Sequence, residues 1–468
     1  MPTYYVSTNG NDLSSGTSTG TALRTLQKAL EKADTLSSTS EAIIIMEPGS
    51  YAFAKLALTS PPDIIIKGDI FGAVFGKTGF VTIGHLDVET NNDFTIQHIR
   101  FDPYSLNPRG SELGYIGYFL AWPSRVCLYI GGSSTRPFTI EYCIFDTSSG
   151  SFGILTNNGC PKTLNIRNNL FYGKGSKNAN TSAVTNLWNY FSGTALTINI
   201  YNNTFYSTIG QPSVAPSKSM VFGFYGAGST ITMDCRNNAF FRFRNSTIYW
   251  TPLSTGTTLT LTSNYNYYDR KVGDANTDFG ASGDEYPYIE NGKWNMLSAC
   301  RNGSTRSNFT SIADMRSNGY DANSKHGPGD IWWGSGLSYD TGTENGPRIV
   351  GTSKLYVQSN SPVSAGGTAG LVTTDIWENT RGNPPDIGAW DFSTIYANRI
   401  EGKDIVFMHN RVYMKSPPTL PNTNRSSLLI AGTPKSLLFA FNILSDLPTL
   451  PTTYTDGVFN IVTPARTV

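Results

Sequence analysis

A short phrase returns along this chain and restricts what it can fold into. "NIRNNLFY" stands at 165–172, "NIYNNTFY" at 199–206 and "DCRNNAFF" at 234–241. Alignment on the phrase gives six copies, at 94–102, 138–146, 164–172, 198–206, 233–241 and 261–269, whose starts are 26 to 44 residues apart. Within a copy the apolar residues alternate, as Leu164 and Ile166 do. Alternation predicts a short strand and a bend, because helical repeats keep a fixed period and a stripe of about 3.6 residues.

Insertions of variable length between short strands favour a solenoid, in which each coil adds one strand to a growing parallel sheet. Coils stacked about 4.8 Å apart would place equivalent residues above one another. Asn169, Asn203, Asn238 and Asn266 are therefore predicted to form a file whose amide groups bond from coil to coil. The alternative is a β-sandwich with coincidental Asn turns.

Composition argues against several classes of protein. Charged residues are 15% of the 468 and the net charge is +1, so no basic face indicates nucleic acid. No apolar run reaches the roughly 18 residues of a membrane span. The start, "MPTYYVSTNGND", lacks the features of a signal peptide. We therefore expect a soluble protein that does not insert into membranes and is not exported by the common route. The five scattered cysteines predict buried thiols rather than a disulfide framework.

The first 40 residues are expected to close one end of the solenoid. In "TLQKALEKA" (25–33), Thr25 is a plausible N-cap, and Leu26, Ala29, Leu30 and Ala33 form an apolar stripe at helical spacing. An amphipathic helix there would cover strand edges that otherwise invite aggregation. Further early coils are predicted at 42–51, 63–71 and 80–88.

Several stretches have the look of a known family. They are the start, "TYYVSTNGND" to "AIIIMEPGSY" (3–51), then "TSIADMRSNGYDANS" (310–324), "NSPVSAGGTAG" (360–370) and "RGNPPDIGAWDF" (381–392). Together they resemble the right-handed parallel β-helix proteins of the pectate-lyase-like superfamily over roughly 1–392. The resemblance implies that fold, with a capping helix and with closing coils at 360–392. Arg381 and Asp386 would then have structural duties, and Gly388 would give the backbone room.

The chain changes character after Phe392, where Gly thins out and Pro clusters in 414–424 and 445–453. The apolar segment 427–441 is too short to span a bilayer and needs a covering surface. We predict three domains in an all-β protein. They are an N-terminal strand and capping helix (1–40), the right-handed parallel β-helix (41–392), and a small C-terminal β or extended domain (393–468) for capping, attachment or oligomerisation.

No sequence motif of a common enzyme class is present, so candidate catalytic groups rest on local acidity. The loop 268–288 supplies Asp269, Asp274, Asp278, Asp284 and Glu285, the weak candidates for a glycosidase pair of carboxylates. A lyase would need clustered carboxylates for Ca²⁺, with Asp87, Glu89 and Asp93 as candidates, and a basic residue, which is not evident there. In both cases the alternative is a hydrated loop. We otherwise expect no metal and no cofactor.

Aromatic stretches favour carbohydrate binding, because flat rings bordered by polar groups suit sugar rings. The candidates are Trp188, Tyr190, Asp330, Trp332, Trp333 and Tyr339. Only one of the two adjacent tryptophans could face a ligand if their segment is extended. The alternative is that these rings pack against the coil wall or an oligomer interface.

Three functions remain open at this stage. The first is a bacteriophage virion surface protein, a tailspike, receptor-binding or capsid-surface protein that engages host surface polysaccharide with or without cleavage. It would reach the exterior on lysis, bind other virion proteins through 393–468, and be compatible with a homotrimer. The second is a bacterial polysaccharide lyase, requiring Ca²⁺, or a glycoside hydrolase. The third is a purely structural virion component.

Overall fold

A computed structural model describes the fold. The described residues are 1–37, 40–57, 62–89, 92–102, 126–131, 136–147, 152–156, 161–173, 183–189, 192–207, 218–224, 226–241, 248–250, 256–268, 297–301, 305–309, 312–326, 331–333, 337–338, 348–349, 355–357, 363, 365–389, 399–400, 404–408, 411–412, 429–430, 436–440 and 443–444. The chain divides into two compact units, Met1–Asp391 and Phe392–Val468.

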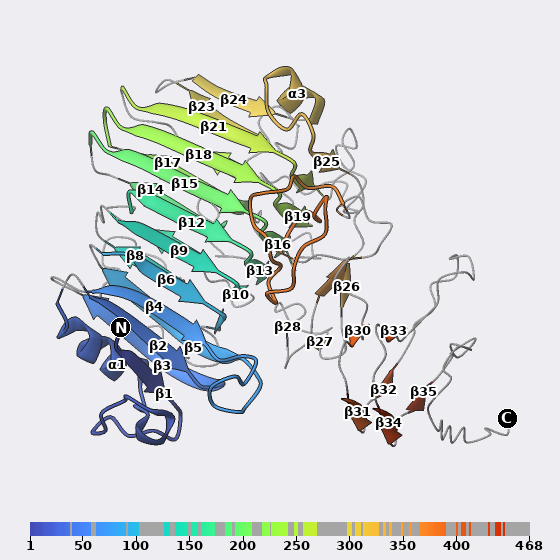
Figure 1. Ribbon diagram of the computed structural model, residues 1–468. Coiled ribbons are helices and arrows are strands. Elements are labelled where there is room, and N and C mark those ends of the chain that lie inside the picture. The colour runs from blue at the N-terminus through green and yellow to red at the C-terminus, as the bar shows by residue number, and fades with distance from the viewer. Residues whose placement is uncertain are drawn as a thin grey trace. The chain divides into compact units, whose positions relative to one another are not determined.

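One sheet of the first unit has nine parallel strands, and their spatial order follows the chain (Figure 1). The strands are β1 (Thr3–Val6), β2 (Glu41–Met46), β4 (Asp63–Gly68), β6 (Phe94–Gln97), β9 (Pro137–Glu141), β12 (Thr163–Arg167), β15 (Ala195–Tyr201), β18 (Thr230–Arg236) and β21 (Thr258–Asn264). Burial alternates along these strands, as in β4, where Ile64 and Ile66 face the core. One face of the sheet is therefore apolar and the other polar.

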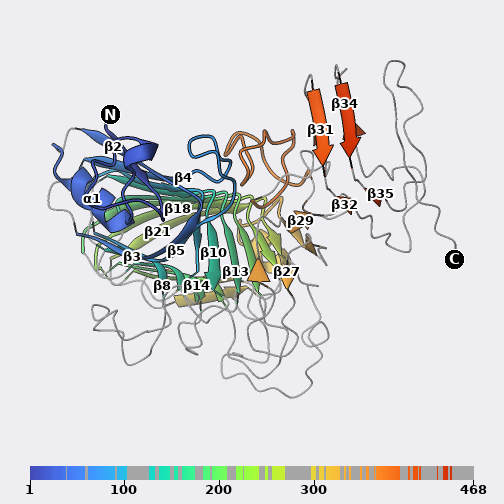
Figure 2. The same cartoon turned by 90° about the horizontal axis from the view of Figure 1, so that it is seen from below.

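The opposite sheet has 16 strands and lies across the core from the first (Figure 2). It contains β3 (Gly49–Ala57), β5 (Val81–Glu89), β7 (Ile99–Phe101), β8 (Val126–Gly131), β10 (Ile144–Thr147), β11 (Phe152–Thr156), β13 (Leu170–Gly173), β14 (Ala183–Asn189), β16 (Thr204–Ser207), β17 (Lys218–Phe224), β19 (Ala239–Phe241), β20 (Ile248–Trp250), β22 (Tyr267–Tyr268), β23 (Leu297–Arg301), β24 (Thr305–Phe309) and β25 (Lys325–His326). Its pairs are parallel except β23 with β24.

Five of the six predicted copies are a strand of the first sheet, a two-residue turn and a strand of the second, as in β12 and β13. In the first copy only His98 separates β6 from β7. The described protein is thus all-β with parallel sheets, consistent with a parallel β-helix. Six rings stack through its core with centroids 4.6 to 5.5 Å apart, namely Phe101, Phe145, Phe171, Phe205, Phe240 and Tyr268.

The predicted asparagine file is confirmed. The Asn203 Oδ1 atom accepts hydrogen bonds from the backbone N and the Nδ2 of Asn169, both at 3.0 Å. Asn238 serves Asn203 in the same way, and the Asn266 Oδ1 atom accepts from Asn238 N at 2.9 Å. All four side chains are fully buried. The file therefore gives the inner turns of these four copies side-chain partners within the protein.

A second file lies one residue earlier in each copy, where the backbone takes the left-handed conformation. Its members are His98, Tyr142, Asn168, Asn202, Asn237 and Tyr265, with φ between 54° and 58°. Asn adopts this conformation more readily than most residues, which explains why Asn168, Asn202 and Asn237 occupy the position in three successive copies. We call this set the turn file.

Helix α1 (Leu26–Asp34) forms as predicted. The Thr25 hydroxyl accepts a hydrogen bond from Lys28 N at 3.2 Å, and the four predicted apolar residues are buried in the main core. The short helix α3 (Ile312–Ser317) falls in the stretch 310–324 that carried part of the family resemblance. Cys127, Cys143 and Cys235 are buried free thiols, as expected. The side chains of Cys160 and Cys300 are not among those described, so the expectation is untested for these two cysteines.

Residues 365–389, here called the strap, differ from the closing coils that the resemblance implied. They contain no strand longer than a single bridge pair and lie along the turn file (Figure 1, orange). Thr368 exchanges two hydrogen bonds with Asn237, and the Thr374 carbonyl accepts one from Asn168 at 2.7 Å. The outward amides of Asn168 and Asn237 thus bind the strap.

The structural duties expected of Arg381 and Gly388 are confirmed. The Arg381 guanidinium donates to the carbonyls of Thr374, Asp386 and Gly388. Gly388 has φ of 102°, and a Cβ there would lie 2.6 Å from the Thr204 hydroxyl. The strap can therefore approach the coil only with glycine at this position.

The second unit contains three parallel strand pairs: β30 (Arg399–Ile400) with β33 (Leu429–Ile430), β31 (Asp404–Met408) with β34 (Ser436–Ala440), and β32 (Arg411–Val412) with β35 (Ile443–Leu444). A gap of two residues separates β31 from β32 and β34 from β35, as in the last five copies of the first unit. Sequence analysis missed this repetition. The Pro-rich stretches 414–424 and 445–453 lie outside the described residues.

Candidate functional site

The polar groups at the end of four neighbouring strands converge on the strap. We call them the edge cluster: Lys67, Gln97, His98, Glu141, Tyr142, Arg167 and Glu378. Parallel register places Lys67 beside Gln97, Gln97 beside Glu141, and Glu141 beside Arg167. His98 and Tyr142 follow directly in the turn file, and Glu378 comes from the strap.

Two short chains of contacts hold the cluster together. On the sheet, Glu141 accepts from Gln97 Nε2 at 2.6 Å and from Arg167 Nε at 2.5 Å. At the strap, Glu378 Oε1 lies 2.9 Å from His98 Nε2 and 3.5 Å from Lys67 Nζ. The rings of His98 and Tyr142 stack at 5.0 Å and join the two chains. Lys67 and Arg167 therefore each face a carboxylate of the cluster.

Electrostatics within the cluster favour an ionised Glu378. The hydrogen bond from His98 is the main reason that the pKa of Glu378 falls to about 2. Burial is the main cause that raises the pKa of Tyr142, with Glu141 and Glu378 adding to it. The Tyr142 hydroxyl itself lies 2.9 Å from the Thr374 hydroxyl of the strap.

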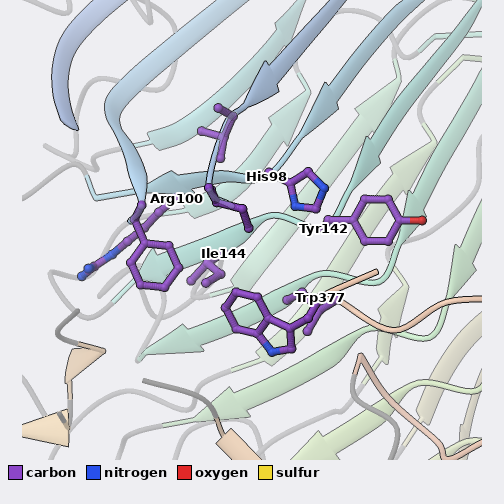
Figure 3. Close-up of a pocket in the computed structure, with 9 residues that line it drawn as sticks. His98, Arg100, Tyr142, Ile144 and Trp377 are labelled. Atoms are coloured by element: carbon purple, nitrogen blue, oxygen red, sulfur yellow. The ribbon is translucent and has the colours of Figure 1, made fainter. Parts of the chain in front are cut away.

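A pocket adjoins the edge cluster and shares two of its residues (Figure 3). Its enclosed space is about 10 Å³, room for about one water molecule, and the rest of the hollow is open to solvent. Its walls are Ile70, Phe80, His98, Ile99, Arg100, Tyr142, Ile144, Ile376 and Trp377. A shallow apolar hollow with aromatic walls thus meets a rim of carboxylate, amide and ammonium groups.

Arg100 also belongs to a buried ionic group behind the pocket. Its Nη2 atom lies 3.7 Å from Asp102 and 3.6 Å from Asp146, whose carboxylate accepts a short hydrogen bond from the Tyr172 hydroxyl. Burial would lower the pKa of Arg100, but Tyr172 and the two aspartates outweigh it and raise the value. Mutual satisfaction of these charges indicates a structural role.

The structure corrects the prediction that the acidic segment proposed to bind Ca²⁺ is a solvated loop. Asp87 lies within strand β5 rather than in a solvated loop, and it is buried. Its register partner is Lys55, with Nζ 3.7 Å from the carboxylate, so a basic residue in register does exist. Burial raises the pKa of Asp87 to about 6. Among the described residues, no group of three or more His, Cys, Asp or Glu could hold a metal ion.

Of the other sequence candidates, most lie outside the described residues: Asp269, Asp274, Asp278, Asp284, Glu285, Tyr190, Asp330 and Tyr339. Trp188 lies in β14, paired with Gly223. Trp332 and Trp333 lie in β26 (Ile331–Trp333), opposite Tyr356 and Leu355 of β29 (Leu355–Val357). The backbone is extended at all three tryptophans. Trp188 belongs to the 16-stranded sheet, whereas Trp332 and Trp333 belong to the two-stranded sheet of β26 and β29.

Sequence reasoning missed the edge cluster. The partner of His98, Glu378, lies 280 residues later in the sequence. The available signal was the repeat itself, which places His98 and Tyr142 at the turn position of Asn168. By contrast, His85 is a satisfied core residue. Its Nδ1 lies 2.6 Å from the Val126 carbonyl, and burial lowers its pKa to about 4.

Comparison with protein-family models and with curated proteins found no match to this chain. The edge cluster and its pocket therefore have to be interpreted from their own chemistry. In the part of the chain that the structure describes, no helix is long and apolar enough to cross a membrane.

Proposed function

We propose that this protein is a bacteriophage virion surface protein, of the tailspike, receptor-binding or capsid-surface kind, that engages a host surface polysaccharide at the edge cluster. The proposal includes the finer fold, a right-handed parallel β-helix similar to the pectate-lyase-like superfamily and capped by α1. The parallel sheets and the asparagine file support that fold.

The observation that carries the proposal is the junction of the pocket and the edge cluster. Sugar rings present C–H faces that pack on aromatic rings, and hydroxyls that need planar polar partners. Tyr142 and Trp377 supply rings, while Glu141, Gln97 and Arg167 supply planar groups beside them. Strands and strap hold these groups in place, so little ordering accompanies binding.

A glycan array tests the proposal with the full chain and three variants. Glu141→Gln removes the charge that orders Gln97 and Arg167, and Trp377→Leu removes a pocket ring. Each should weaken binding about tenfold or more, as expected for a buried polar partner or an aromatic anchor. Phe53→Leu is the control and should bind normally. Phe53 lies on β3, and its half-exposed ring stacks on His85 of β5.

The array result decides between the first and third functions. Wild-type protein that is folded but binds no glycan would contradict the proposal and favour a purely structural virion component. Equal loss in all three variants would instead indicate general destabilisation, and the edge cluster would no longer be the supported site.

The enzyme alternative also has a specific observation in its favour. Two carboxylates, Glu141 and Glu378, belong to the edge cluster, and glycoside hydrolysis needs two carboxylates that flank the scissile bond. Release of reducing ends that stops in Glu378→Gln and in Glu141→Gln would establish a hydrolase. Unsaturated products that depend on Ca²⁺ would establish the lyase instead.

A further inference from the structure

In the described sheets, each copy of the first unit pairs with its two neighbours. The strands β6, β9, β12, β15 and β18 follow one another in space as they do in the chain, so each pairs with the one before it and the one after it. A stack of this kind behaves as a one-dimensional array, in which a copy is stabilised by its own contacts and by those with its neighbours. Such an array can open from an end, one copy at a time.

The strap crosses this stack. It makes hydrogen bonds to one residue in each of five successive copies, across 131 to 280 positions of sequence: His98, Tyr142, Asn168, Thr204 and Asn237. Its first arm begins beside Asn237 and ends at Glu378, beside His98. Its second arm returns and ends at Ala389, whose N–H donates to Thr204 Oγ1 at 2.9 Å. The strap therefore joins copies that share no strand pairing.

The two arms of the strap are bound to each other as well as to the copies. Arg381 Nε donates to the Thr374 carbonyl of the first arm at 2.8 Å. Its Nη2 atom donates to the Gly388 carbonyl of the second arm at 2.8 Å and to Asn168 Oδ1 at 2.9 Å. Three apolar residues of the strap are at most 1% exposed, namely Ile376, Ile387 and Ala389. The strap therefore docks as one folded piece.

The surface that receives the strap exists only when the copies have stacked. The contacted residues lie at the turns, and parallel pairing of β6 to β18 is what aligns these turns. A slip of register in any copy would move its turn away from the strap. The strap also follows all five copies in the chain. Its docking therefore completes the first unit and depends on correct register in each of the five.

We propose that the strap is a conformational lock that couples these five copies, so that they open together instead of one at a time. Since the strap is bound to every one of them, a copy can leave the stack only if its bonds to the strap also break. The lock goes beyond the proposed glycan binding and does not depend on it. It gives the first unit slow, all-or-none opening.

Two glycines of the strap provide a matched pair of variants. Gly388 has φ of 102°, and a Cβ there would lie 2.6 Å from Thr204 Oγ1, so Gly388→Ala should displace the second arm. Gly370 has φ of 85° and no atom within 4 Å of an added Cβ, so Gly370→Ala brings backbone strain without a clash. Arg381→Gln is a second test, because it removes bonds to both arms. The two test substitutions are also combined.

Amide hydrogen exchange of the full-length protein in low urea, followed by mass spectrometry, measures the opening of each copy. In the wild type the protection of β6, β9, β12, β15 and β18 should agree within about threefold, because the copies open together. In Gly388→Ala and Arg381→Gln it should spread over about tenfold or more, because each copy then depends on its neighbours alone. Gly370→Ala should behave as the wild type does.

The same data contain the results that would overturn the lock. One is a wild-type protein whose five strands already differ in protection by about tenfold or more. Another is a variant in which the strap loses protection while the strands keep a common value. A strap that stays protected in the double variant would also overturn it. So would loss of β-type circular dichroism in both single variants, since the strap would then be needed to form the copies and not to couple them.

Discussion

At the inner turn of each coil, one residue has to accept and donate at once. Asn203 accepts from Asn169 in the coil before it, and its Nδ2 donates to the Ile166 carbonyl at 2.8 Å. An aspartate could not donate, and an alanine could do neither. The left-handed residue before it exposes these backbone groups, which is why the amide recurs where the chain bends.

Replacement of Asn203 by alanine should lower the free energy of unfolding by about 3 kcal/mol, because two buried backbone groups lose their partners. Urea denaturation measures this. Asn199→Ala is the control, since its amide donates to Asn165 on the partly exposed outer face, and its effect should stay below about 1 kcal/mol. Similar losses in both variants would show that the file does not stabilise the inner turn.

The repeated residues were predictable because they follow the coil. Phe171, Asn169 and the helix at Thr25 depend on local pattern, and the structure has them where the sequence predicted. The His98–Glu378 contact depends on a strap that docks from 280 residues away, and no periodicity encodes it. Lys55 opposite Asp87 was missed for a related reason, since β3 falls outside the aligned copies.

At the scale of elements, the strap is a tight turn held against the turn file at several points. Asp375 Oδ1 accepts from the backbone N of Trp377 and of Asn379, both at 2.9 Å, and shapes the turn that presents Glu378. Glu378 itself has φ of 62°. Its bond to His98 therefore fixes the tip of the strap, together with the wall that Trp377 gives to the pocket.

Acid should loosen this tip. The pKa of Glu378 is lowered from 4.5 to about 2, mainly by the hydrogen bond from His98. A depressed folded-state pKa means that the stabilisation is complete above about pH 4.5 and is lost as the pH falls toward 2. The Lys67 ammonium, 3.5 Å away, also faces this carboxylate. The protection of the amides of residues 374–381 against hydrogen exchange, taken relative to the intrinsic rate at each pH, should therefore fall within this window.

Glu378→Gln tests the assignment. Its uncharged side chain should leave the backbone amides of the strap less protected than in the wild type at neutral pH, and their protection should change little within the acid window. Glu31→Gln is the control, since Glu31 pairs with Lys28 on α1 and does not contact the strap in any described bond. If wild-type and Glu378→Gln proteins respond alike to acid, another group anchors the strap.

At the scale of the whole molecule, both units use the same sequence of elements. The pattern of β31 and β32 returns in β34 and β35, and the register pairs Ile405 with Leu437 and Phe407 with Phe439. The residues between them, Val406 and Leu438, are apolar too, whereas the polar Asn165 separates Leu164 from Ile166 in the first unit. The repetition was overlooked because its turns lack the double asparagine, so the proline content dominated the interpretation.

The division at Phe392 allows the proposed attachment role to be tested by truncation. We expect residues 1–392 to retain the β-type circular dichroism and glycan binding of the full chain, because both sheets and the edge cluster lie within Met1–Asp391. Incorporation into particles should be lost, since β30 to β35 go with the removed segment. Sedimentation of the truncated and full-length chains, each added to particles lacking the protein, measures this. Truncated protein that sediments with particles as well as the full chain would assign attachment to the first unit.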